Sequence, residues 1–124
     1  GNIIGIVAQR LVRKLCQHCK EAYLASEIEA RILATTGTPT IYRAVGCERC
    51  DHRGYKGRMT IMELLKMDVE LDELVSQRAS SQEIRRVALS KGFRTLADDG
   101  SRRVLDGSTS IEEVSRVVDL TSRI

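Results

Sequence analysis

The chain has 124 residues, enough for one small domain or one module with an attached subdomain. Its 20 basic and 17 acidic residues give a formal charge of +3, which is not the imbalance expected of a dedicated nucleic-acid binder. Hydrophobic residues make up 42% of the sequence but aromatic residues only 3%, so we expect a thin core of Leu, Ile, Val and Ala that a bound metal would help to stabilise.

The first 15 residues are apolar and carry two kinds of periodicity. Ile4, Val7, Ala8 and Leu11 fall at helical spacing, whereas residues 11–15 alternate as in a strand. We therefore predict a short helix followed by a strand of about five residues that leads into the first cysteine pair.

The four cysteines form two C-x-x-C pairs, called hooks below: Cys16 with Cys19, and Cys47 with Cys50. In each hook the two thiolates can turn toward one point, and two hooks supply the four soft ligands of a tetrahedral Zn²⁺. Because protein would fill all four positions, none is open for water or substrate. The spacing predicts a structural zinc site.

Other interpretations of the cysteines remain open. Two disulfides are possible, but we see no signal peptide and no membrane-length apolar run, so we expect a reducing compartment. A thioredoxin-like redox pair would need a C-x-x-C beside a βαβ pattern, and four unrelated buried thiols would not explain the paired spacing. His18 and His52 could each replace a thiolate, but with four cysteines available we expect both to be solvated loop residues.

Basic residues flank both hooks. Four thiolates with one Zn²⁺ would lower the formal charge of the chain to about +1. Lys14, Lys20, Arg49 and Arg53 would offset the negative charge of such a cluster, or they are ordinary surface charges.

The excursion between the hooks predicts one helix and one strand. Ser26 followed by Glu29 is a capping-box signature, which predicts a helix over residues 26–34 that Gly37-Thr38-Pro39 ends. Residues 41–45 alternate as in a strand that approaches the second hook. Since no reactive group lies here, we interpret the excursion as a structural flap.

A glycine-containing turn and a strand follow the second hook. Gly54 and Gly57 allow positive φ, so the backbone can return close to the metal. The phosphate-binding pattern G-x-x-x-x-G-K-[ST] is absent from the sequence. Residues 58–65 predict a strand, which we pair with residues 11–15, so that both hooks lie at the end of one two-stranded ribbon.

From residue 67 the pattern changes to capped amphipathic helices. Asp68 is a candidate N-cap of a helix that points Leu71, Leu74 and Val75 inward. A capping box of Ser80 and Glu83 begins a second helix, which Lys91 and Gly92 end.

Two more helices complete the predicted bundle of about four. One runs from about Thr95 to Asp106 and ends at Gly107; Gly100 within it marks a close helix contact or a local break. Thr109 with Glu112 caps the last helix. The predicted buried stripe of that helix consists of Ile111, Val114, Val117 and Val118.

The charged residues of these helices do not single out an active site. Arginines alternate with carboxylates, so we expect a salt-bridged solvent face rather than a phosphate or nucleic-acid patch. The patterns G-x-S-x-G and H-E-x-x-H are absent. We therefore predict no catalytic and no cofactor-binding residue.

Several motifs together resemble the C-terminal part of the type II secretion and type IV pilus assembly ATPases. They are Ala8-Gln9-Arg10-Leu11-Val12-Arg13-Lys14-Leu15-Cys16, the run from Gly46 to Arg58, Met62-Glu63-Leu64-Leu65, and the helix from Asp99 to Gly107. The resemblance implies an α+β fold in four parts: a remnant of a RecA-like ATPase core (1–15), a tetracysteine metal-binding subdomain (16–57), a returning core strand (58–66) and a C-terminal helical subdomain (67–124).

The same resemblance implies a function. The metal ligands would be Cys16, Cys19, Cys47 and Cys50, whereas the family's Walker and other nucleotide-binding segments have no counterpart here, so ATP and Mg²⁺ would belong to the parent protein. The parent would be a hexameric motor on the cytoplasmic face of the bacterial inner membrane, peripheral to it through partners. Those partners would be other subunits and inner-membrane platform or secretion proteins. A zinc-ribbon nucleic-acid-binding module and a redox enzyme remain the alternatives.

Overall fold

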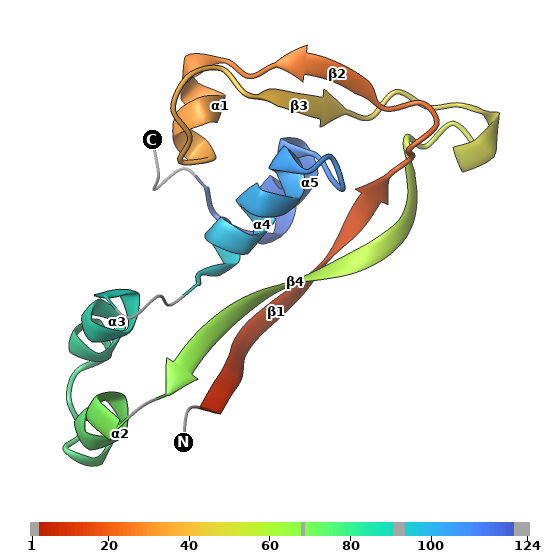
Figure 1. Ribbon diagram of the computed structural model, residues 1–124. Helices are drawn as coiled ribbons and strands as arrows, with labels where there is room; N and C mark the ends of the chain where they lie inside the picture. Colours follow the sequence, from red (N-terminus) through yellow and green to blue (C-terminus); the bar gives the residue numbers. More distant parts are fainter. Residues whose placement is uncertain (1–2, 68, 91–93, 121–124) are drawn as a thin grey trace.

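A computed structural model of the chain describes residues 3–67, 69–90 and 94–120 (Figure 1). The fold is α+β, as predicted, and combines two small antiparallel sheets with five α-helices among these residues. The elements are β1 (Ile3–Leu15), β2 (Glu21–Leu24), α1 (Glu27–Ile32), β3 (Thr40–Arg43), the 3-10 helix η1 (Glu48–Cys50), β4 (Tyr55–Met67), α2 (Val69–Ser76), α3 (Ser81–Ser90), α4 (Leu96–Leu105) and α5 (Ile111–Val117).

A long ribbon of β1 and β4 carries the hooks at one end. The strands run antiparallel with Leu11 opposite Thr60 and Arg13 opposite Arg58, which confirms the predicted pairing. The predicted helix within the first 15 residues is wrong, because β1 is extended over its whole length. The helical spacing there is a local pattern, and pairing with β4 decides the conformation because it satisfies the backbone hydrogen bonds of both strands.

The flap between the hooks consists of α1 and a second ribbon of β2 and β3 (Figure 1). Ser26 caps α1: its hydroxyl accepts from the N–H of Glu29, and the Glu29 carboxylate accepts from the N–H of Ser26, which confirms the capping box. β2 was not predicted. It pairs with β3 in a second two-stranded sheet, separate from the β1–β4 ribbon that was predicted.

The hydrophobic core lies between the flap and helices α4 and α5, which Figure 1 shows beneath the flap and beside the long ribbon. A Cβ atom on Gly100 would lie 2.6 Å from Cγ1 of Val114, so the absence of a side chain allows α4 and α5 to approach each other. The predicted close helix contact is confirmed. The buried residues of the core are Ala25, Leu33, Ile41, Val104, Val114 and Leu120.

Helices α2 and α3 lie at the other end of the long ribbon, away from the hooks (Figure 1). The hydroxyl of Ser80 accepts from the N–H of Glu83 at 3.1 Å, as the predicted cap of α3 requires. Val75 was predicted to point inward, but 52% of it is exposed, because α2 packs on α3 and leaves this face uncovered. The predicted cap Asp68 and the predicted stop at Lys91 and Gly92 lie outside the described residues.

The cap of the last helix differs from the prediction by one residue. Ser110, not Thr109, accepts the N–H of Glu113, while the Thr109 hydroxyl donates to the carbonyl oxygen of Arg13 at 2.8 Å. Of the predicted stripe, Val114 is fully buried and Ile111 is half-buried. Within the described parts of the chain, no helix has the length and apolar character needed to cross a lipid bilayer.

Candidate metal centre

The four cysteine sulfurs converge at the end of the β1–β4 ribbon. All four Sγ atoms lie within 4.8 Å of one another. Three of the Sγ–Sγ distances are 3.8 Å: Cys16 to Cys47, Cys19 to Cys50, and Cys47 to Cys50. A tetrahedral Zn²⁺ with Zn–S bonds of about 2.3 Å separates its sulfurs by about 3.8 Å. The donor set and its spacing therefore fit one tetrahedral ion.

The backbone around the hooks fixes this arrangement. Cys16 directly follows β1, and its N–H donates to the carbonyl oxygen of Gly54 at 2.9 Å, which ties the first hook to the turn after the second. Gly54 has φ +83, and a Cβ there would lie 2.6 Å from Cβ of Ala44. Only glycine fits this close approach. The predicted positive φ is confirmed at Gly54 and Gly57.

Backbone N–H groups point at two of the sulfurs. Gly46 donates to Sγ of Cys19 at 3.3 Å, and Cys47 and Gly54 each donate to Sγ of Cys50 at 3.2 Å. Burial opposes ionisation of Cys50, but these donations outweigh it and lower the pKa of its thiol to about 6. Burial dominates at Cys19 and raises the pKa of that thiol to about 11. A bound cation would favour the thiolate form of both.

The alternatives to a metal site match the geometry less well. The four thiols are free, and their sulfur separations of 3.8 Å exceed the roughly 2.05 Å of a disulfide. His18 and His52 are both exposed, and neither belongs to the sulfur cluster, as predicted.

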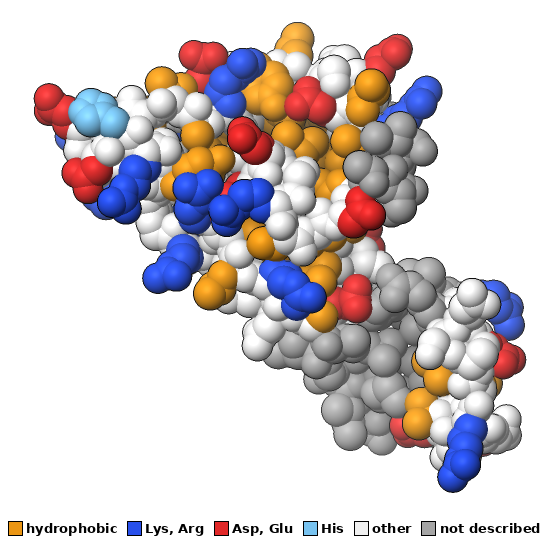
Figure 2. Space-filling model, turned by 180° about the vertical axis from the view of Figure 1, so that it is seen from behind, with side chains coloured by type: hydrophobic (Ala, Val, Ile, Leu, Met, Phe, Trp, Pro, Cys, Tyr) orange, Lys and Arg blue, Asp and Glu red, His pale blue; other side chains and the backbone are white. Residues whose placement is uncertain are grey.

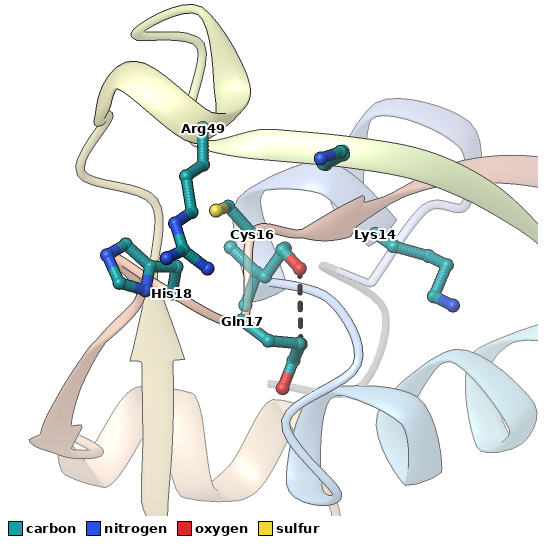
Figure 3. A pocket seen from close by; sticks show the side chains of 7 residues that line it. Lys14, Cys16, Gln17, His18 and Arg49 are labelled. Carbon is teal, nitrogen blue, oxygen red and sulfur yellow. Dashed lines mark hydrogen bonds between the residues drawn. The ribbon is translucent and has the colours of Figure 1, made fainter.

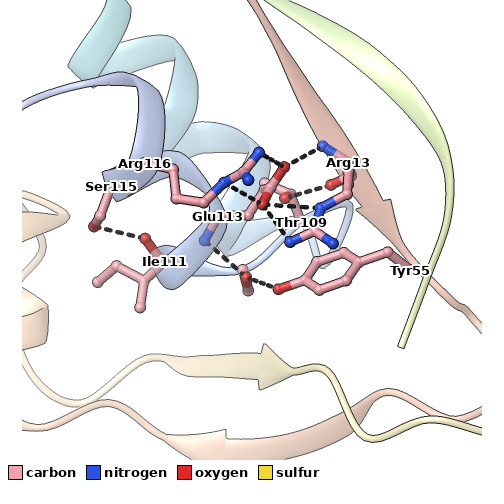
Figure 4. Close-up of polar contacts among 8 residues, drawn as sticks. Arg13, Tyr55, Thr109, Ile111, Glu113, Ser115 and Arg116 are labelled. Atoms are coloured by element: carbon pink, nitrogen blue, oxygen red, sulfur yellow. Dashed lines mark hydrogen bonds and ion pairs between the residues drawn. The ribbon is translucent and has the colours of Figure 1, made fainter. Parts of the chain in front are cut away.

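A buried carboxylate fastens α5 to the strand that leads into the first hook (Figure 4). Glu113, whose side chain is fully buried, accepts from the backbone N–H of Arg13 at 2.7 Å and from its Nη2 at 3.0 Å. Nε of Arg116 lies 3.1 Å from the same carboxylate. Burial alone would raise the pKa of Glu113, but the bonds from Arg13 and the charge of Arg116 hold that pKa below its usual value.

A second buried carboxylate, Asp99, fastens α4 to β4. It accepts from the backbone N–H of Met62 at 2.8 Å and from Nη2 of Arg102 at 2.8 Å. Arg103 also pairs with Asp106, at 3.5 Å, so the predicted salt-bridged helix face is confirmed for these pairs. The roles of Asp99 and Glu113 were not predicted, because their backbone partners lie far away in the sequence and no local pattern indicates them.

The chain is similar to proteins of secretion and pilus assembly. A family described as Type II/IV secretion system protein matches residues 1–116. Type II secretion system protein E of Pseudomonas aeruginosa is 44% identical over 119 residues, which cover 94% of this chain and 24% of that protein. Type II secretion system ATPase E of Vibrio cholerae is 43% identical over 123 residues, with 94% and 24% covered.

A pilus protein shows the same relationship. Type IV pilus assembly ATPase PilB of Thermus thermophilus is 40% identical over 116 residues, which cover 90% of this chain and 13% of that protein. The chain therefore spans a quarter or less of the length of these relatives. Since the matched family covers residues 1–116, the chain belongs to the Type II/IV secretion system protein family.

Proposed function

We propose that this chain is the metal-binding, non-catalytic part of a motor that drives protein secretion or pilus assembly. The observation that carries the proposal is the convergence of four cysteine sulfurs within 4.8 Å in a chain whose relatives are secretion and pilus assembly ATPases. No phosphate-binding G-x-x-x-x-G-K-[ST] occurs in the sequence, so ATP turnover would belong to other parts of such a motor.

The role proposed for the metal is structural. The four ligands of the Zn²⁺ would be Cys16, Cys19, Cys47 and Cys50. Because thiolates would fill all four positions, the ion would cross-link the chain and would not take part in catalysis. The ion would join the end of β1 to the turn that begins β4, at the end of the ribbon. The core cluster lies under the flap, and the metal would add a cross-link at the end of the ribbon, where Leu15 is buried next to the first hook.

The partners proposed are other subunits of a hexameric motor and an inner-membrane platform or secretion protein, at the cytoplasmic face of the membrane. In the same proposal, residues 1–15 and 58–66 belong to the ATPase core, 16–57 form the metal subdomain and 67–124 the helical subdomain. Nucleic acid is not a proposed partner, because the rings of Tyr23, Tyr42 and Tyr55 are each covered by a Lys or Arg side chain, at 4.0–4.3 Å. These faces are therefore not open for base stacking.

A chimera tests the proposal. The matching segment of Type II secretion system protein E of Pseudomonas aeruginosa would be replaced by this chain, and secretion measured in cells that lack the native protein. We expect the chimera to restore secretion, and we expect a chimera that also carries Cys47→Ser to lose it because one metal ligand is gone.

Two comparisons make the outcome decisive. The abundance of both chimeras would be compared by immunoblot, and Thr36→Ala, a change at an exposed position of the flap, provides the matched control. Equal secretion by the intact and the Cys47→Ser chimeras at equal abundance would contradict a role for the metal site. ATP hydrolysis by the isolated chain, abolished by a substitution within it, would contradict the non-catalytic assignment.

A further inference from the structure

A hollow lined by positive charges lies beside the first hook. It is open to solvent, its volume is about 440 Å³, and Lys14, Arg49 and Lys56 contribute its permanent charges, with His18 and buried Cys16 beside them. Figure 3 shows Arg49 and His18 next to each other and Lys14 on the other side of Cys16. No carboxylate is among the residues that line this space, which we call the basic hollow.

The cations of the basic hollow differ from three arginines of α4 and α5. Arg102, Arg103 and Arg116 each pair with a carboxylate. Among the side chains that the structure describes, no carboxylate lies within ion-pair distance of Lys14, Arg49 or Lys56, and all three cations are exposed. Positive charges that converge on a concave surface without a partner within the chain are available to an anionic partner.

The metal does not by itself account for these charges. Four thiolates with Zn²⁺ carry about −2, and only Cys16 of the four lines the basic hollow. Glu48 and Asp51 are exposed on the second hook, but neither lines the space. A second hollow of about 480 Å³ is lined by Arg13, Arg53 and Arg58, also without a carboxylate in its lining. Figure 2 shows Lys and Arg side chains spread over the larger part of the visible face, with Asp and Glu side chains among them.

We propose that the basic hollow receives carboxylate side chains from an acidic segment of a protein partner. A flexible segment with several carboxylates can place one beside each of these exposed cations, of which Arg49 and Lys14 lie on either side of Cys16. Arg49 offers a planar guanidinium that binds a carboxylate through two parallel hydrogen bonds, and Lys14 and Lys56 add point charges. This inference rests on the proposed function, in which the metal-bearing end of the ribbon contacts another component of the motor.

A binding experiment tests it on the zinc-loaded chain. The probe is a fluorescein-labelled peptide of alternating Glu and Ser, followed by fluorescence anisotropy, with the Gln and Ser peptide as its uncharged counterpart. We expect the acidic peptide to bind, the Gln peptide not to bind, and the double variant Arg49→Ala, Lys56→Ala to bind the acidic peptide about tenfold more weakly. The matched control, Arg31→Ala with Arg86→Ala, removes the same charge from exposed positions on α1 and α3 and is expected to change affinity less than about twofold.

Every other outcome would overturn the inference. Equal weakening by both double variants would mean a non-specific effect of net charge. Binding of the chain to phosphatidylglycerol vesicles but not to the acidic peptide would assign the surface to a membrane. The zinc content and melting temperature of each variant separate this inference from the proposed function. If the Arg49→Ala, Lys56→Ala variant keeps its metal and its stability and still binds the acidic peptide with unchanged affinity, only the role of the basic hollow is contradicted.

Discussion

The carboxylate of Glu113 lies 2.7 Å from the backbone nitrogen of Arg13, a residue 100 positions earlier in the chain. We expect Glu113→Gln to lower the free energy of unfolding by about 1–3 kcal/mol, because an amide cannot accept the bonds from Arg13 and Arg116 as a carboxylate does. Urea denaturation measures this loss. Glu112→Gln changes an exposed neighbour and is expected to have little effect; equal effects of the two changes would contradict the role given to Glu113.

The same carboxylate predicts a pH dependence. The pKa of Glu113 in the folded chain lies below its usual value of 4.5, so its contribution to stability is present above that pH and is lost as the pH falls below it. We expect the difference in melting temperature between the unmodified chain and Glu113→Gln to stay constant from about pH 7 to about pH 5 and to narrow below 4.5. Both proteins carry the same cysteines, so loss of metal in acid affects them alike. A difference that widens in acid would contradict the assignment.

The contact between α4 and α5 predicts the effect of a methyl group. We expect Gly100→Ala to destabilise the chain by about 1–3 kcal/mol, although alanine favours helices, because its Cβ would lie 2.6 Å from Cγ1 of Val114. Val114→Ala removes the clashing group, so the double variant should lose less stability than the sum of the two single variants. Thermal unfolding of the four proteins forms the cycle. A more stable Gly100→Ala variant would show that the helices are not in close contact.

The cap of α5 gives a prediction that distinguishes two adjacent residues. Ser110→Ala should cost about 1–2 kcal/mol and speed amide hydrogen exchange at Glu113, because Ser110 accepts that N–H. Thr109→Val also removes a hydroxyl, but its hydroxyl donates to Arg13, so the Glu113 amide should stay protected. Faster exchange at Glu112 in Thr109→Val, together with unchanged exchange at Glu113 in Ser110→Ala, would restore the cap expected from the sequence.

Local signals were sufficient for much of the fold. Ser26 with Glu29 predicted the start of α1, and Gly107, with φ +84, follows the end of α4 as expected. The paired spacing of the hooks predicted that their sulfurs converge, because two residues between cysteines place both thiols on one side of a tight turn. The β1–β4 pairing could be predicted because both strands border the hooks.

Features that depend on distant partners could not be predicted. Residues 4–11 satisfy a helical spacing, and β4, more than 40 residues further on, decides that they are extended. Thr109 with Glu112 and Ser110 with Glu113 both match the capping-box pattern in the sequence, and the hydrogen bond from Thr109 to the carbonyl oxygen of Arg13 chooses between them. The basic hollow likewise joins Lys14 to Arg49 and Lys56 across the folded hooks.

The proposed structural metal ion depends on four thiolates that bind it together. Native mass spectrometry with elemental analysis of the purified chain tests it most directly, with the Cys47→Ser variant measured beside it. We predict one zinc per chain in the unmodified protein, loss of metal and a lower melting temperature in Cys47→Ser, and thiols that become reactive only after chelation. A metal-free chain with four reactive thiols, or a mass that shows two disulfides, would contradict the account.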